Sequence, residues 1–307
     1  RVGSEMCIRD RLIFSAFLLF SNAYLVKANS DILSQDSTGK YCINTEQDYY
    51  NFIENIQNYN NKTVILCNDI DISDVPEATS SFGGILNGKG HTITYASKEA
   101  KENIAVFPFR INDNGIVENI NVQIDESYAY NSETDEFQTV FSRCDGIAKG
   151  ITIKGNVTCI YDDEDTDVYI GAIEGNGTLM DSSIAITYDL QSEKTIEEIA
   201  DDIVDNDLSF EFCQLGTINT GITYQNCIGY GQYSEAIKSL ADELEPKIKD
   251  NTWGYLCVSF TRKSFFSTSA SATNCYYDKE NMPDIKIMSE YITNRDNLSL
   301  IHISEPT

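Results

Sequence analysis

The chain has 307 residues, a formal net charge of −26 at pH 7 and a sequence pI near 4.2. This charge argues strongly against a nucleic-acid partner, which needs a basic face, and it disfavours binding to an anionic membrane surface. A strongly acidic surface favours solubility and the binding of divalent cations.

Both ends of the chain carry segments that we do not expect in the natural protein. Residues 2–10 and 298–307 back-translate into DNA strings that are reverse complements of one another. An inverted repeat at the two edges of a reading frame resembles translated sequencing adapter, whereas the alternative is a natural terminal motif. We therefore interpret residues 1–11 and 298–307 as adapter-derived.

Residues 12–28 are interpreted as the remnant of a secretory signal peptide. They begin with an apolar run that is short for crossing a bilayer, and they end in Val26-Lys27-Ala28, which suits cleavage. A membrane helix is the alternative interpretation. Export predicts an extracellular or cell-surface location, with no membrane insertion of the mature chain. Residues 29–41 are polar and are expected to form a disordered lead-in.

An even number of cysteines remains once the end segments are removed, and this suits the oxidising compartment that export implies. These residues are Cys42, Cys67, Cys144, Cys159, Cys213, Cys227, Cys257 and Cys275. Disulfides between successive neighbours are the simplest connectivity, and buried free thiols are the alternative. No CxxC motif or histidine accompanies them, so we do not expect a zinc site.

Residues 42–67 are expected to close the N-terminal end of a single domain that spans residues 42–297. Thr45 and Asp48 have the spacing of a helix N-cap. One apolar stripe of the predicted helix follows: Tyr49, Phe52, Ile53 and Ile56. A Cys42–Cys67 disulfide would hold this helix over the first strand, which begins at Thr63.

A short pattern recurs between residues 106 and 186. Each copy has a glycine turn, an alternating strand, a turn and a second alternating strand, and the copies begin at Gly115, Gly146 and Gly177. An apolar pair precedes each copy; these pairs are Val106-Phe107, Val140-Phe141, and Ile170 with Ala172. The second interval between pairs is shorter than the first. The pattern predicts the rungs of a solenoid, which must stack because no rung buries its own apolar face.

Four motifs resemble bacterial-type surface proteins with GLUG-like repeats over roughly residues 42–280. They are Leu66-Cys-Asn-Asp-Ile-Asp-Ile72, Phe82-Gly-Gly-Ile-Leu-Asn-Gly-Lys-Gly-His-Thr-Ile-Thr94, Tyr169-Ile-Gly-Ala-Ile-Glu-Gly-Asn-Gly-Thr-Leu179 and Asn274-Cys-Tyr-Tyr-Asp278. The resemblance implies an all-β fold, a right-handed parallel β-helix, which occurs in adhesins, cell-surface proteins and some extracellular enzymes. It implies no fixed active site.

Two inserted helices are predicted at residues 195–204 and 234–244, where apolar residues fall on one helical face. Thr195 and Glu198 form a capping box at the first, and Pro246 ends the second. We expect both helices to cover apolar surface on the flank of the solenoid. A ridge for docking a partner is the alternative.

Few residues have the pattern of a catalytic site. His91 is the one histidine outside the end segments, and a structural role in its turn is favoured, so a catalytic triad has little support. Arg143 and Lys149 share a rung and are the best candidates for the base of a polysaccharide lyase, whereas Arg110 and Lys154 are scattered. Aromatic platforms for glycan stacking are the other candidates, with packing as the alternative: Tyr128, Tyr130, Tyr276 and Tyr277.

The densest acidic cluster contains Asp162, Asp163, Asp165 and Asp167. Ca²⁺ is the one cofactor considered there, because hard cations take carboxylate oxygens. The spacing does not fit an EF-hand, and a solvated hairpin tip is favoured. A second acidic group is expected at the surface: Asp69, Asp71 and Asp74. Glycosylation acceptors are predicted at Asn61, Asn156 and Asn176 if the source organism performs this modification.

Export, rungs and the lack of a catalytic set favour a non-catalytic adhesin or structural interaction module. Its expected partners are cell-surface glycans or proteins, and self-association into a fibre is a further hypothesis. The alternative is a carbohydrate-active enzyme of the polysaccharide-lyase kind on the same scaffold.

Overall fold

A computed structural model describes most of the chain between Leu33 and Lys247. The gaps are 74, 77, 79, 97–104, 127, 132–135, 163–165, 207, 217–220, 230–231 and 245–246; beyond Lys247 it describes residues 255–259, 272–273 and 276–277. The predicted end segments 1–11 and 298–307 and the predicted signal remnant 12–28 lie outside these residues.

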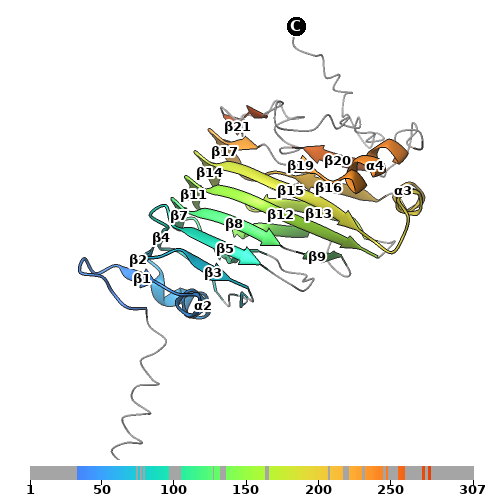
Figure 1. Cartoon of the computed structure of the whole chain (residues 1–307). Helices are drawn as coiled ribbons and strands as arrows, with labels where there is room; N and C mark the ends of the chain where they lie inside the picture. The colour runs from blue at the N-terminus through green and yellow to red at the C-terminus, as the bar shows by residue number, and fades with distance from the viewer. Residues whose placement is uncertain are drawn as a thin grey trace, which may run out of the picture.

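The strands form three parallel sheets, which we call sheets A, B and C (Figure 1). Sheet A contains β1 (Tyr41–Ile43), β2 (Thr63–Leu66), β4 (Ile85–Asn87), β7 (Ile116–Glu118), β11 (Ile147–Lys149), β14 (Thr178–Met180), β17 (Thr223–Gln225) and β21 (Ala272–Thr273). Sheet B contains β3 (Ile70–Ile72), β5 (Thr92–Ala96), β8 (Asn121–Glu126), β12 (Thr152–Tyr161), β15 (Ser183–Gln191), β18 (Ile228–Gly229) and β22 (Tyr276–Tyr277), with β9 (Tyr128–Asn131) beside β12 and β19 (Gln232–Tyr233) beside β15. Sheet C contains β6 (Phe107–Ile111), β10 (Glu136–Cys144), β13 (Val168–Ile173), β16 (Ser209–Cys213) and β20 (Tyr255–Ser259).

From β6 onward, the chain visits sheets C, A and B in turn and then begins the next rung. The predicted all-β fold built from parallel strands is therefore confirmed. Ile85, Ile116, Ile147 and Thr178 are register partners at equal intervals along the chain, so the rung length is constant in this part of sheet A. The unequal intervals between the apolar pairs belong to sheet C, where Phe107 and Phe141 are register partners and the pairing of β10 with β6 and with β13 shifts register.

The core lies inside the three sheets. Along β12 and β15 the buried and less buried residues alternate, as a strand with one face inward requires. Isoleucine dominates these inward positions, for example Ile153 paired with Ile184 and Ile93 paired with Val122. No single rung could bury these side chains, so stacking supplies the core.

The first helix, α2 (Glu46–Glu54), packs against the beginning of sheet C. Thr45 caps it by accepting a hydrogen bond from the Asp48 amide, and the short 3₁₀ helix η1 (Ile56–Tyr59) follows. Tyr49 donates its hydroxyl to the Val106 carbonyl at 2.6 Å, and the Phe52 ring lies 5.8 Å from that of Phe109 in β6. Sheets A and B have earlier strands, whereas sheet C begins at β6, so α2 covers the side that sheet C has not yet reached.

The prediction of a disordered lead-in over residues 29–41 is wrong for residues 33–41. Gln35 pairs antiparallel with Tyr41, the Cys42 amide donates to the Ser34 carbonyl, and Asp36 accepts three hydrogen bonds within the turn. Leu33 is buried, and its amide donates to the Tyr59 hydroxyl. This segment is ordered because it pairs with the otherwise free edge of β1.

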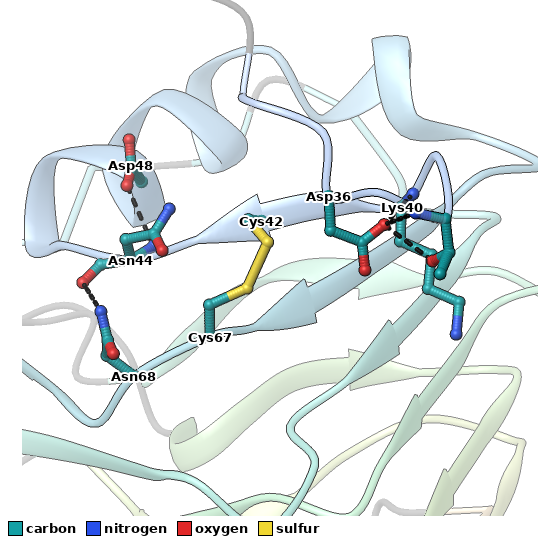
Figure 2. Close-up of a disulfide and its surroundings, with 8 residues drawn as sticks. Asp36, Lys40, Cys42, Asn44, Asp48, Cys67 and Asn68 are labelled. Atoms are coloured by element: carbon teal, nitrogen blue, oxygen red, sulfur yellow. Dashed lines mark hydrogen bonds between the residues drawn. A yellow bond between two sulfur atoms is a disulfide. The ribbon is translucent and has the colours of Figure 1, made fainter.

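A disulfide joins Cys42 in β1 to Cys67 after β2, as predicted (Figure 2). The residues between them include α2 and η1. Beside the bond, Asn68 donates its side-chain amide to the Asn44 carbonyl, and the Asn44 amide donates to Asp48 of α2. The bond and these contacts hold β1, β2 and the start of α2 together.

Removing this disulfide should lower the free energy of unfolding. The cysteines are separated by 25 residues, and closing a loop of that length removes enough unfolded-chain entropy to stabilise the fold by about 3 kcal/mol. We expect the double variant Cys42→Ser/Cys67→Ser to lose this amount in a denaturant titration. Reductant should destabilise the wild type equally and leave the double variant unchanged; a reductant effect on the double variant would contradict the assignment.

Two further helices, α3 (Ile196–Asp205) and α4 (Glu235–Leu244), lie where the chain passes from sheet B to sheet C. The Thr195–Glu198 capping box is present at α3. The helices contact each other, and their apolar faces are buried: Ile199, Ala200, Ile203, Ile237, Leu240, Ala241 and Leu244. Lys194 and Tyr161 both contact Asp202, which fixes α3 to the end of β12.

Candidate functional site

The long strands of sheet B present a regular outward face. We call its outward side chains on β5, β8, β12 and β15 the sheet B face. They are Thr92, Thr94, Ala96, Asn121, Gln123, Asp125, Thr152, Lys154, Asn156, Thr158, Ile160, Ser183, Ala185, Thr187, Asp189 and Gln191. Parallel register aligns them in columns across the strands, such as Thr92, Asn121, Thr152 and Ser183.

Uncharged hydroxyl and amide groups prevail on this face, although the chain carries a net charge of −26. Each such group both donates and accepts hydrogen bonds. Neighbouring columns repeat at the interstrand distance of about 4.8 Å, so a ligand would meet an ordered row of these groups. The face therefore suits a neutral, hydroxyl-rich ligand better than a charged one.

The predicted aromatic platforms relate to this face through backbone register. In the backbone register of sheet B, Tyr128 pairs with Thr158 and Tyr130 pairs with Ile160. Tyr276 pairs with Ile228, which continues the column of Ser183. Tyr277 pairs with Gly229, the partner of inward Ile184. Three of the four predicted tyrosines thus share the register of the sheet B face.

The predicted lyase candidates do not come together. Arg143 in β10 is the register partner of Arg110 in β6, and the Nε atoms of both contact Oδ2 of Asp145, at 3.1 and 2.6 Å. Arg143 also contacts Glu174 at 3.0 Å, and the Asn176 amide donates to the second Asp145 oxygen. Lys149 is exposed on the outer side of sheet A, and Lys154 lies on the sheet B face.

The charges in this cluster balance, with two guanidinium groups facing two carboxylates. Hydrogen bonding to Asp145 raises the pKa of Arg143. Partial burial raises the pKa of Asp145, but the Arg143 and Asn176 hydrogen bonds and the charges of Arg143 and Arg110 outweigh it and lower the pKa overall. Both shifts favour the charged forms of Arg143 and Asp145, so Arg143 is held as a charged partner of Asp145 at the corner between sheets C and A and is poorly suited to act as a proton-abstracting base.

Asp145 should make stability depend on pH in the acid range. Its pKa is lowered in the folded chain, so its contribution is complete above the unfolded value of about 4 and is lost as pH falls through the folded value. We expect the Asp145→Asn variant to lose less stability than the wild type between neutral pH and pH values below about 4. Asp113→Asn, at an exposed residue of a nearby turn, is the control, and equal acid slopes for both variants would refute the assignment.

His91 lies in the turn that precedes β5 and contacts Asp69. Its Nδ1 atom is 3.0 Å from Asp69 Oδ1, which also accepts the Thr92 amide at 2.8 Å. The Thr92 amide and then His91 lower the pKa of Asp69. These contacts join the turn to the preceding rung, as a structural histidine would. Asp69 and Asp71 are exposed as predicted, whereas Asp74 lies outside the described residues.

The predicted Ca²⁺ cluster is described only in part. Asp162 is exposed, and Asp167 accepts the Tyr169 hydroxyl at 3.3 Å, whereas Asp163 and Asp165 lie outside the described residues. Among the residues whose side chains are placed, no group of three or more histidine, cysteine or carboxylate side chains gathers as metal ligands do.

The predicted pairing of successive cysteines is wrong for Cys144–Cys159 and Cys213–Cys227. Cys144 ends β10 in sheet C and Cys159 lies in β12 of sheet B, and both are buried free thiols whose pKa burial raises to about 12. Cys213 and Cys227 are also buried and form no disulfide with each other. Cys144 and Cys159 fall on different sheets, and Cys227 lies between β17 and β18 whereas Cys213 ends β16 of sheet C. Cys257 lies in β20, and Cys275 lies outside the described residues.

Sequence reasoning missed Gln214, one of the few buried polar residues. Its side-chain oxygen accepts the Ile186 amide and its side-chain nitrogen donates to the Ile186 carbonyl, both at 2.9 Å. Ile186 lies in β15, between the residues that pair with β18 and those that pair with β19. The Gln214 side chain thus gives both backbone polar groups of Ile186 a hydrogen-bond partner inside the core. Its position directly after β16, whose residues Phe210, Phe212 and Cys213 are buried, is the one sequence signal for it.

All three predicted glycosylation acceptors are exposed. Asn61 and Asn176 lie in turns, and Asn156 lies within β12. No helix in the described part of the chain has the length and apolar character needed to cross a membrane. Comparison with known proteins found no matching family model, no matching curated protein and no matching solved structure.

Proposed function

We propose that the chain is an exported, cell-surface or extracellular interaction module that binds neutral glycans through the sheet B face. In this proposal, the three sheets close into a right-handed parallel β-helix of the GLUG-like kind, with α2 as its N-terminal cap. The module performs no reaction and presents a rigid surface to its partner.

The observation that carries this proposal is the hydroxyl- and amide-rich character of the sheet B face on a strongly acidic chain. Thr152 illustrates it, because its neighbours across the sheet are Asn121 and Ser183. Sugar hydroxyl groups need such donors and acceptors, held at fixed spacing by a rigid scaffold. Tyr128 and Tyr130 add aromatic residues at positions of the same register.

The test is binding of the full chain to insoluble neutral polysaccharides, compared between two matched variants. Thr152→Glu places a carboxylate in the middle of the sheet B face, whereas Thr178→Glu places one on the outer side of β14 in sheet A. We expect the first variant to lose binding by tenfold or more, about 1.4 kcal/mol, and the second to bind like the wild type. Equal binding by both variants would refute the assigned face.

The enzymatic alternative is tested in parallel with acidic polysaccharides. A lyase would release unsaturated products, whereas the charge-balanced state of Arg143 leads us to expect none. Product formation that persists in Arg143→Gln and ends in Lys149→Gln would assign the reaction to the outer side of sheet A.

A further inference from the structure

The three glycosylation acceptors occupy different surfaces of the molecule. Asn61 is in the turn before β2 and adopts a left-handed backbone with φ of 59°. Asn176 is in the turn between β13 and β14, and its amide donates to Asp145. Asn156 alone belongs to the sheet B face, where it is the register partner of Thr187 in β15. A glycan attached at Asn156 would therefore lie on the sheet B face, whereas a glycan at Asn61 or Asn176 would not.

Asn156 lies on the outward side of β12. This strand pairs with β8 up to Gly155 and with β9 from Thr158 onward. Val157 is fully buried, whereas Asn156 is exposed, so the Asn156 side chain points away from the core. Thr158, the hydroxyl residue of the Asn-x-Thr motif, lies on the same face.

We infer that an N-linked glycan on Asn156 covers the sheet B face and controls access of ligands to it. This inference rests on the proposed function of that face. The strands from β8 to β15 span two interstrand spacings, about 10 Å, so a branched oligosaccharide rooted on the middle strand reaches both neighbours. The sheet B face is then open to ligands when Asn156 is unmodified, and it is covered by the glycan when Asn156 is modified.

The attachment needs one co-reactant, an oligosaccharide linked to a lipid pyrophosphate. The Asn156 side-chain nitrogen forms a bond to C1 of the first sugar, and the bond from C1 to the pyrophosphate oxygen breaks. The lipid pyrophosphate leaves with the bonding electron pair, and the amide gives up one proton to a base. No oxidation or reduction takes place.

The test measures occupancy and shielding separately. The full chain is secreted from a eukaryotic host that glycosylates exported proteins, and mass spectrometry of its peptides reports occupancy at each acceptor. An amine-reactive reagent then labels Lys154, two residues from Asn156, and Lys149, which is exposed on sheet A and serves as the internal control. We expect an occupied Asn156 and a Lys154 that has lost most of its reactivity relative to Lys149.

The Asn156→Gln variant, and enzymatic removal of glycans from the folded wild type, should both restore Lys154 labelling. Asn61→Gln should not. An unmodified Asn156 overturns the inference, as does an occupied Asn156 with full Lys154 labelling. Loss of polysaccharide binding in every preparation, with shielding of Lys154 intact, would instead reject the proposed function and leave the shield established.

Discussion

Replacing Gly146 with alanine is expected to lower the free energy of unfolding by about 3 kcal/mol or more, because the added atom has no room. Gly115, Gly146 and Gly177 stand one rung apart at the corner where sheet C passes to sheet A. A Cβ atom on Gly146 would overlap the carbonyl oxygens of Asn112 and Gly115. The Gly115 carbonyl accepts the Ile147 amide at 3.0 Å, so it cannot move aside without losing a rung-to-rung hydrogen bond.

The matched control is Gly90→Ala, which tests the cost of the left-handed backbone where the added methyl group is not crowded. Gly90 has a φ of 81°, and nothing lies within 4 Å of an added Cβ, so its cost is the left-handed backbone of about 1 kcal/mol. Denaturant titration of the two variants separates crowding from backbone conformation. A smaller loss for Gly146→Ala than for Gly90→Ala would show that the rungs stack less closely at this corner than the structure has them.

Gln214→Met is the second substitution for which we expect a large effect. Methionine matches glutamine in length but carries neither the oxygen nor the nitrogen that pairs with Ile186. The Ile186 amide and carbonyl would then be buried without partners, at a cost of about 1–3 kcal/mol for each group. We expect the free energy of unfolding to fall by about 2–5 kcal/mol.

Gln225→Met provides the control, since Gln225 is exposed on the outer side of β17. We expect this substitution to change the free energy of unfolding by less than about 0.5 kcal/mol. Amide hydrogen exchange adds a local readout, because the Ile186 amide should lose protection in Gln214→Met before its neighbours in β15 do. Unchanged exchange at Ile186 would contradict the assignment of Gln214 as the group that protects this amide.

Much of the architecture follows from local pattern. Alternating residues such as those in 152–161 can only be strands with one face inward, and the glycines at 115, 146 and 177 mark the corners. The helices at α3 and α4 carry their apolar residues on one face in the sequence itself. The disulfide between Cys42 and Cys67 was predictable because these cysteines flank the predicted helix and the first strand, which the bond holds together.

What could not be predicted depends on partners that are distant in sequence. The register shifts of sheet C, which contains the apolar pairs at 106–107 and 140–141, arise from pairing between strands of different rungs. Arg110 meets Asp145, and Arg143 meets Glu174, only because rungs stack, so these two contacts have no local signal. The same is true of the sheet B face, whose columns exist only once the register is known.

The equal rungs of sheet A have a consequence for how this molecule can change in size. Excising residues 116–146 would join Gly115 directly to Ile147, which is already the register partner of Ile116. Gly115 would still be followed by an isoleucine, Ile147 in place of Ile116. The buried residue after it would be Ala148 in place of Val117. Internal duplication or loss of this segment would therefore lengthen or shorten the protein in whole steps, while both of its ends stay as they are.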